Sequence, residues 1–177
     1  MGKLFDRLTH KLEVRCRPYC AALVAAAGSS ERMGGTDKLT AMLGGVPVLV
    51  RTLTALDRAE LVDEMIRLGQ KTYAAAPALP VTDTVKVADM QGVVQSTPDR
   101  KTLFAVQTPQ VFQANILKAA LQSAVNDGAA LTDDCSAVER LGKEVYLAAG
   151  WKENIKITTP EDLTVAEALL RERESGL

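Results

Sequence analysis

Histidine and cysteine are scarce in this chain of 177 residues. It has one histidine, His10, and three cysteines, Cys16, Cys20 and Cys135. An odd, widely spaced set of thiols does not form a disulfide framework, and one histidine cannot complete a zinc ligand pattern. We therefore expect reduced thiols in a cytoplasmic protein, with no catalytic nucleophile–base pair built on histidine.

Long apolar runs, aromatic residues and an excess of charge are missing as well. Aromatic residues make up 4% of the chain, and the net charge is −1. No apolar run is long enough to span a bilayer, and a nearly neutral chain has no general attraction for nucleic acid or anionic membranes. We therefore expect neither nucleic-acid binding nor stable membrane association. Hydrophobic residues still amount to 47%, which predicts a globular chain with a substantial core.

The chain divides into a short basic extension and a single domain. Residues 1–19 carry apolar residues at helical spacing among lysines and arginines, so we expect a surface helix or a frayed arm there. Residues 20–177 form the domain. Within it, residues 83–107 alternate polar and apolar side chains in short pieces separated by turns. This pattern predicts an extended arm of strands, a β-arm, rather than another β–α–β unit.

The stretch 21–39 reads AALVAAAGSSERMGGTDKL and joins an apolar run to a loop of small residues. The run ends at Gly28 and is short enough for a buried strand. The small residues that follow expose backbone N–H groups, and Arg32 and Lys38 supply donors that match phosphate oxygens. The pattern predicts a strand and a loop that hold a triphosphate. A plain turn with solvated charges is the alternative for any single glycine-rich loop.

Periodicity and turn signals predict the remaining elements. We expect strands over 73–79, 144–149 and 154–158, and helices over 47–58, 60–71, 113–126, 132–142 and 160–174. The first two of these helices follow each other with no strand between them. Because successive parallel strands of a doubly wound sheet are joined through single crossovers, this seam is unusual.

Five segments, in order along the chain, together resemble one enzyme family. They are AAAGSSERM with Lys38, PVTDTVK at 80–86, DRKTLFAVQTPQVF at 99–112, GAALTDDCSAVE at 128–139 and NIKITTPEDL at 154–163. These motifs are similar to those of the 2-C-methyl-D-erythritol 4-phosphate cytidylyltransferases. The resemblance implies an α/β, Rossmann-like nucleotidyltransferase fold: a mostly parallel central sheet flanked by helices, with an extended β-arm.

The resemblance also implies a reaction. It is transfer of a cytidylyl group from CTP to 2-C-methyl-D-erythritol 4-phosphate, with release of pyrophosphate, in the synthesis of isoprenoid precursors. Such chemistry rests on positioning and charge neutralisation rather than on a covalent nucleophile. The implied catalytic residues are Arg32, Lys38 and Lys156, which neutralise the phosphates. The implied nucleotide-lining residues are Ala26, Ala27 and Gly28.

The family likewise implies contacts to the polyol phosphate from Arg100, Thr108 and Thr132. Its β-arm crosses to a second subunit of a homodimer, so Arg100 and Thr108 are expected to serve the partner's site. Each assignment has a structural alternative: Thr132 as a helix cap, Arg100 as a turn residue, and Lys156 as the outward face of a strand.

One part of the family pattern is missing. Nothing between Leu56 and Ala76 matches the loop that selects cytosine, or the Asp-Ala/Gly-Ala-Arg-Pro motif whose aspartate binds Mg²⁺. The gap coincides with the seam between the two predicted helices, so several dozen residues are absent near 58–62. Either the physical protein contains further residues there, or the segment is deleted. Mg²⁺ is thus an implied cofactor without an identified ligand. The alternative functions are a ribitol-5-phosphate cytidylyltransferase and an inactive nucleotide-binding remnant.

Overall fold

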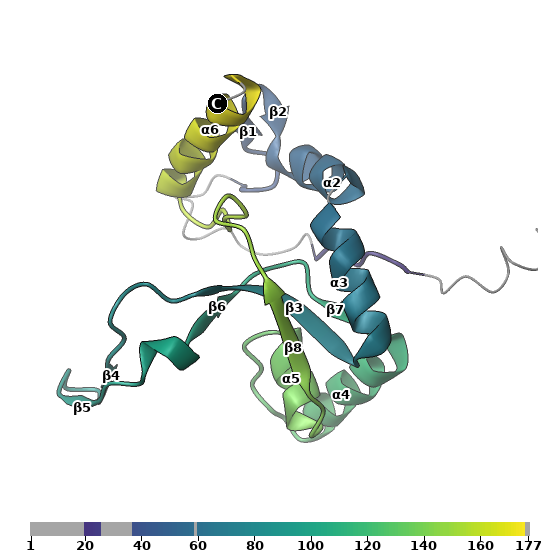
Figure 1. The fold of residues 1–177 in the computed structure, drawn as a ribbon, viewed down its shortest axis with the longest axis vertical. Helices are drawn as coiled ribbons and strands as arrows, with labels where there is room; N and C mark the ends of the chain where they lie inside the picture. Colours follow the sequence, from purple (N-terminus) through teal and green to yellow (C-terminus); the bar gives the residue numbers. More distant parts are fainter. Residues whose placement is uncertain (1–19, 26–36, 59, 176–177) are drawn as a thin grey trace, which may run out of the picture.

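The computed structural model of the chain describes residues 20–25, 37–58 and 60–175 (Figure 1). A first group of elements consists of the hairpin β1 (Met42–Leu43) and β2 (Val46–Pro47), helix α2 (Val48–Arg58) and helix α6 (Pro160–Ser175). Both helices contact the hairpin, although α6 comes from the far end of the chain. The C-terminal helix therefore lies beside a hairpin that comes more than one hundred residues earlier in the chain.

The central sheet is built around β3 (Ala74–Pro80). Strand β8 (Val145–Ala149) pairs with it in parallel, while β6 (Phe104–Val106) and β7 (Val111–Phe112) pair with it antiparallel. Ala78 has Ala149 as partner on one edge and Val106 on the other. The fold is α/β as predicted, but the described strands pair both parallel and antiparallel, so the sheet is mixed rather than mostly parallel.

Alanines on β3 let helices approach both faces of the sheet. Ala74 packs with α4 (Ala114–Asn126) and α5 (Asp134–Arg140), whereas Ala75 packs with the fully buried Met65 of α3 (Glu60–Lys71). Because successive side chains of a strand point to opposite faces, α4 and α5 cover one face and α3 covers the other. The result is a three-layer arrangement of the kind that the sequence predicts (Figure 1).

A hairpin projects away from this sheet (Figure 1). It is formed by β4 (Val87–Ala88) and β5 (Val94–Ser96), followed by the 3-10 helix η2 (Arg100–Thr102). The Asp89 carboxylate accepts hydrogen bonds from the backbone of Gln91 and Val93 and so closes the tip of the hairpin. The strands of the predicted β-arm are therefore fewer than expected, because β6 belongs to the central sheet.

Two predicted strands do not form. Residues 20–25 contain neither helix nor strand, and Leu23 is 95% exposed, so the prediction of a buried strand is wrong for 21–25. An apolar run becomes a buried strand only where a sheet edge receives it, and residues 20–25 pair with none of the described strands. Residues 154–158 form no strand either. Hydrogen bonds with the side chains of Gln107 and Asp162 hold this segment instead.

The other predicted elements agree with the structure within one or two residues at most ends. Helices α2 and α3 follow each other with no described strand between them, as the periodicity predicts. Pro47, expected to begin the first helix, instead pairs with Met42 in the hairpin. None of the described helices is both long and apolar enough to cross a membrane.

Candidate functional site

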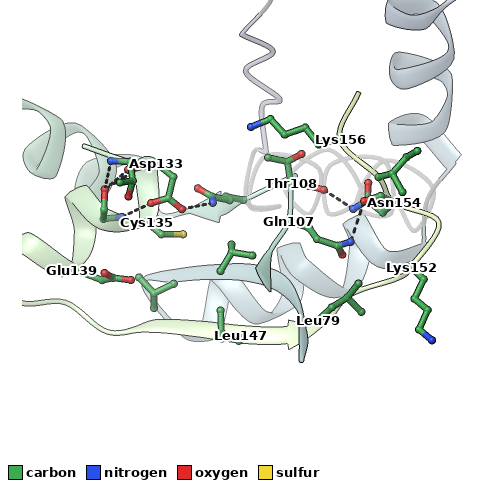
Figure 2. A pocket seen from close by; sticks show the side chains of 16 residues that line it. Leu79, Gln107, Thr108, Asp133, Cys135, Glu139, Leu147, Lys152, Asn154 and Lys156 are labelled. Atoms are coloured by element: carbon green, nitrogen blue, oxygen red, sulfur yellow. Dashed lines mark hydrogen bonds between the residues drawn. The ribbon is translucent and has the colours of Figure 1, made fainter. Parts of the chain in front are cut away.

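A cavity of about 750 Å³ lies beside the central sheet (Figure 2). Its apolar wall comes mainly from the sheet strands: Leu79, Val106, Val145 and Leu147. Polar side chains come from the segment after β6, from α5 and the loop before it, and from the loop after β8. They are Gln107, Thr108, Gln110, Thr132, Asp133, Ser136, Glu139, Lys152, Asn154 and Lys156. The volume suits a small organic ligand, and the mixture of groups suits one with both polar and apolar parts.

The first end of the cavity is the start of α5. Asp133 is the N-cap, and its carboxylate accepts the Ser136 N–H at 2.9 Å while the Ser136 hydroxyl reaches back to the cap in a capping box. The other carboxylate oxygen accepts the Gln110 side-chain amide at 2.8 Å. The interpretation of Thr132 as the cap is therefore wrong, because Asp133 fills that role. Thr132 lines the cavity instead.

The second end is the loop that carries Lys152 and Lys156. Asn154 donates its side-chain amide to the Thr108 carbonyl oxygen at 2.7 Å, which ties this loop to the segment after β6 (Figure 2). Farther along, the Asp162 carboxylate accepts the N–H groups of Thr158 and Thr159 at the start of α6. Lys156 therefore lies on a short irregular segment fixed on both sides, and not on the outward face of a strand.

The two ends differ in charge. Lys152 and Lys156 line one end, and Asp133 and Glu139 line the other (Figure 2). Between the acids lies the buried Cys135, whose thiol pKa is raised to about 12 by burial and then by the neighbouring Asp133 and Glu139 carboxylates. This thiol stays neutral at physiological pH and is not a nucleophile. The cavity can therefore receive an anionic group at its lysine end and hydroxyl groups at its acidic end.

The described residues do not fit a divalent metal ion. No group of three His, Cys, Asp or Glu side chains in residues 20–25, 37–58 and 60–175 lies close enough to hold one. Both carboxylate oxygens of Asp133 are already used, by Ser136 and by Gln110.

The cavity brings together three of the predicted site residues: Thr108, Thr132 and Lys156. Lys38 lies in the turn before β1, and Arg100 lies in η2, where it donates to the Thr82 carbonyl oxygen at 2.7 Å. Neither of them lines the cavity. Thr108, which is expected to serve the partner's site, lines the cavity of its own chain. The remaining predicted residues, Ala26, Ala27, Gly28 and Arg32, lie outside the described residues.

The sequence analysis assigned no role to seven polar residues of the cavity, and four of these connect its walls through hydrogen bonds: Gln107, Gln110, Asp133 and Asn154. All four stand inside segments that carry the family resemblance, directly beside residues that were assigned or close to them. Their position next to these residues in the motifs is the sequence signal that could have identified them. Their role, which is to connect the walls of the cavity, depends on contacts between distant segments and has no local pattern.

The sheet has helices on both faces and a cavity lined by lysine and threonine beside it. This arrangement is a Rossmann-like α/β fold of the nucleotidyltransferase type. The chain belongs to the 2-C-methyl-D-erythritol 4-phosphate cytidylyltransferase (IspD) family, whose model matches residues 58–172.

Individual relatives agree with the family match. The chain is 49% identical over 118 residues to the 2-C-methyl-D-erythritol 4-phosphate cytidylyltransferase of Desulforamulus reducens, covering 67% of this chain and 50% of that protein. It therefore spans about half the length of that relative. The crystal structure of the Thermus thermophilus enzyme of the same name superimposes with a TM-score of 0.67 at 26% identity, covering 76% of this chain and 94% of that one.

A further relative bears on the seam between α2 and α3. The enzyme of the same name from Symbiobacterium thermophilum is 34% identical over 219 aligned residues, covering 86% of this chain and 93% of that protein. An alignment of that length cannot fit a chain of 177 residues without gaps. Internal positions of this relative therefore have no counterpart here, which agrees with the segment that the sequence motifs indicate to be missing.

Proposed function

We propose that the chain transfers a cytidylyl group from CTP to 2-C-methyl-D-erythritol 4-phosphate and releases pyrophosphate. The observation that carries the proposal is the cavity lined by Thr108, Thr132 and Lys156, in a chain of this family. In this reaction a phosphate oxygen of the polyol attacks the α-phosphorus of CTP. The bond from that phosphorus to the bridging oxygen breaks, and pyrophosphate leaves with the electron pair.

The side chains of the cavity supply positioning and charge. Lys156 neutralises the negative charge that grows around the α-phosphorus, and the hydroxyls of Thr108 and Thr132 donate to the polyol phosphate. Leu79 and Leu147 pack against the carbon skeleton of the polyol. Arg32 and Lys38 are proposed to hold the triphosphate, with Ala26, Ala27 and Gly28 lining the nucleotide.

We further propose that the enzyme is a cytoplasmic homodimer that pairs through the arm. Large apolar side chains over residues 85–94 support this, because five of them are more than one third exposed: Val85, Val87, Met90, Val93 and Val94. A surface of this kind on a projecting hairpin is an energetic liability unless another chain covers it. Arg100, near the base of the hairpin and outside its own chain's cavity, then contacts the polyol phosphate bound to the partner.

A second candidate function is binding of the nucleotide or the polyol phosphate without turnover. The direct succession of α2 and α3 favours it, since the cytosine-selecting loop and the metal-binding aspartate are expected between those positions. Such a remnant keeps the cavity and loses the machinery that activates CTP.

Release of pyrophosphate separates these functions. The full chain is supplied with CTP and Mg²⁺ and with either 2-C-methyl-D-erythritol 4-phosphate or ribitol 5-phosphate, in a coupled assay. The proposal predicts release with the first acceptor and little with the second. Release of pyrophosphate only with ribitol 5-phosphate would show that this polyol phosphate is the acceptor. Binding of the methylerythritol phosphate by calorimetry without any release would favour the non-catalytic candidate.

A further inference from the structure

The segment that carries Lys156 leaves the sheet soon after β8. The N–H of Gly150 donates to the Ala78 carbonyl oxygen at 2.9 Å and is the last backbone group after β8 for which a bond to β3 is found. Residues 154–158 form no strand. The placement of Lys156 therefore depends on side-chain hydrogen bonds rather than on a backbone ladder.

The side chain of Gln107 supplies three of these bonds. Its Nε2 donates to the carbonyl oxygens of Trp151 and Asn154, at 2.8 and 3.0 Å, and its Oε1 accepts the Trp151 N–H at 3.1 Å. Asn154 in turn donates its N–H to the Trp151 carbonyl oxygen and its side-chain amide to the Thr108 carbonyl oxygen. One amide group thus holds both ends of the turn over residues 151–154, and Figure 2 shows its bond at the Asn154 end.

This side chain crosses the central strand. The Gln107 N–H donates to the Pro77 carbonyl oxygen at 2.7 Å, on the edge of β3 where Val106 pairs with Ala78. Ala149 pairs with the same Ala78 on the opposite edge. Because the turn over residues 151–154 follows that opposite edge, the amide of Gln107 joins two segments that no backbone pairing connects.

Gly150 makes room for the crossing. A Cβ atom on this residue would overlap Gln107 Oε1 and lie 3.1 Å from the Ala78 carbonyl group. Any other residue would displace the amide or the strand. The partners also fix the orientation of the amide, since exchanging its nitrogen and oxygen would face a carbonyl oxygen toward two others.

We infer that Gln107 is a positioning residue, which holds the turn over residues 151–154 and thereby fixes Lys156 at the cavity. The inference deepens the proposed function and rests on it for its catalytic consequence. Its structural part stands independently, because the hold on the turn can be measured without turnover.

Limited proteolysis of the full chain tests the structural part. Trypsin cleaves after Lys152 and Lys156, and mass spectrometry identifies those two cuts. In Gln107→Leu both cuts should appear several times faster than in the wild type. Gln107→Glu, which keeps the size and the acceptor but loses both donors, should behave alike. Gln122→Leu, on the exposed side of α4, is the matched control and should match the wild type. Wild-type cleavage rates in both Gln107 variants, with the fold intact by circular dichroism, would overturn the inference.

A double-mutant cycle with Lys156→Ala tests the catalytic consequence. Gln107→Leu should lower kcat/KM by up to about 100-fold in the wild-type background, because a displaced charge loses its alignment. It should lower it little further in the Lys156→Ala background, since the group it positions is already gone. Fully additive losses would show that Gln107 does not act through Lys156. A wild-type chain without turnover would overturn the proposed function, and the proteolysis result would then decide the inference alone.

Discussion

The Asp162 side chain holds the end of the segment that carries Lys156. A single oxygen of this side chain accepts the N–H groups of Thr158 and Thr159 and the Thr158 hydroxyl, at 2.7 to 2.9 Å. These bonds, those from Thr158 first, hold the pKa of Asp162 below its usual range. The ionised carboxylate of Asp162 therefore stabilises the folded state. It also anchors the segment that carries Lys156 to the start of α6.

This anchor predicts a pH dependence of stability. Because the folded-state pKa is lowered, the contribution of Asp162 is present above the ordinary value of 3.8 and is lost as the pH falls through the folded-state value. The difference in Tm between the wild type and Asp162→Asn should be constant near neutral pH and shrink below 3.8. Asp63→Asn, which removes the same charge from α3, serves as the control. A Tm difference that stays unchanged under acid conditions would contradict this account.

Lys156 carries the charge that the proposed reaction requires at the cavity. Lys156→Ala should cut kcat by about 100- to 1000-fold while leaving the Tm nearly unchanged, because the lost interaction forms mainly in the transition state. Arg32→Ala and Lys38→Ala should act in the same direction. Lys118→Ala, on the exposed face of α4, should have no effect. Near-normal turnover in Lys156→Ala would reject its role.

At the scale of elements, patterns with local causes could be predicted from the sequence. Helix α3 has an apolar stripe at helical spacing, and α6 begins with Thr159-Pro160-Glu161-Asp162, so both were located closely. The local pattern could not establish whether the apolar run before Gly28 forms a strand. Its periodicity is the same whether or not a sheet edge receives it, and that depends on the rest of the chain.

The candidate site divides in the same way. Thr108, Thr132 and Lys156 were predicted through motifs, and they line one cavity. The capping role of Asp133 could not be separated from that of Thr132 in the sequence, because both are good caps and only the backbone geometry distinguishes them. The bonds of Gln107 to Trp151 and Asn154 join residues more than forty positions apart, which no local pattern records.

The arm predicts complementation between two inactive variants. If Arg100 serves the partner's site and Lys156 its own, mixing Arg100→Ala protein with Lys156→Ala protein should restore part of the activity. One site of each mixed dimer then has both residues intact, whereas each variant alone has none. Light scattering should report a dimer for the wild type. A monomer, or a mixture as inactive as its components, would contradict the arrangement.

At the scale of the whole molecule, the seam between α2 and α3 is the main departure from the family pattern. Among the described strands, the central sheet ends at β8, where Tyr146 and Leu147 are each 45% exposed. A strand with apolar side chains in this condition normally has further strands or another chain beside it. The described sheet therefore lacks part of the cover that a longer relative can supply.

Intact mass spectrometry tests whether the seam is a deletion. The 177 residues correspond to a mass of 19.0 kDa. We expect the physical protein to contain several dozen further residues between about Arg58 and Val62, and therefore to have a larger mass. A measured mass equal to 19.0 kDa would establish a genuine deletion and favour the non-catalytic candidate.

The most direct test of the central claim is phosphorus NMR of the chain with CTP, Mg²⁺ and 2-C-methyl-D-erythritol 4-phosphate. The account predicts that the phosphomonoester signal of the polyol disappears as two coupled diphosphate signals and free pyrophosphate appear together. Lys156→Ala should leave the starting signals in place over the same time. Unchanged CTP and polyol phosphate signals with the wild-type chain, under conditions where calorimetry shows both ligands bound, would contradict the claim that this chain is a cytidylyltransferase.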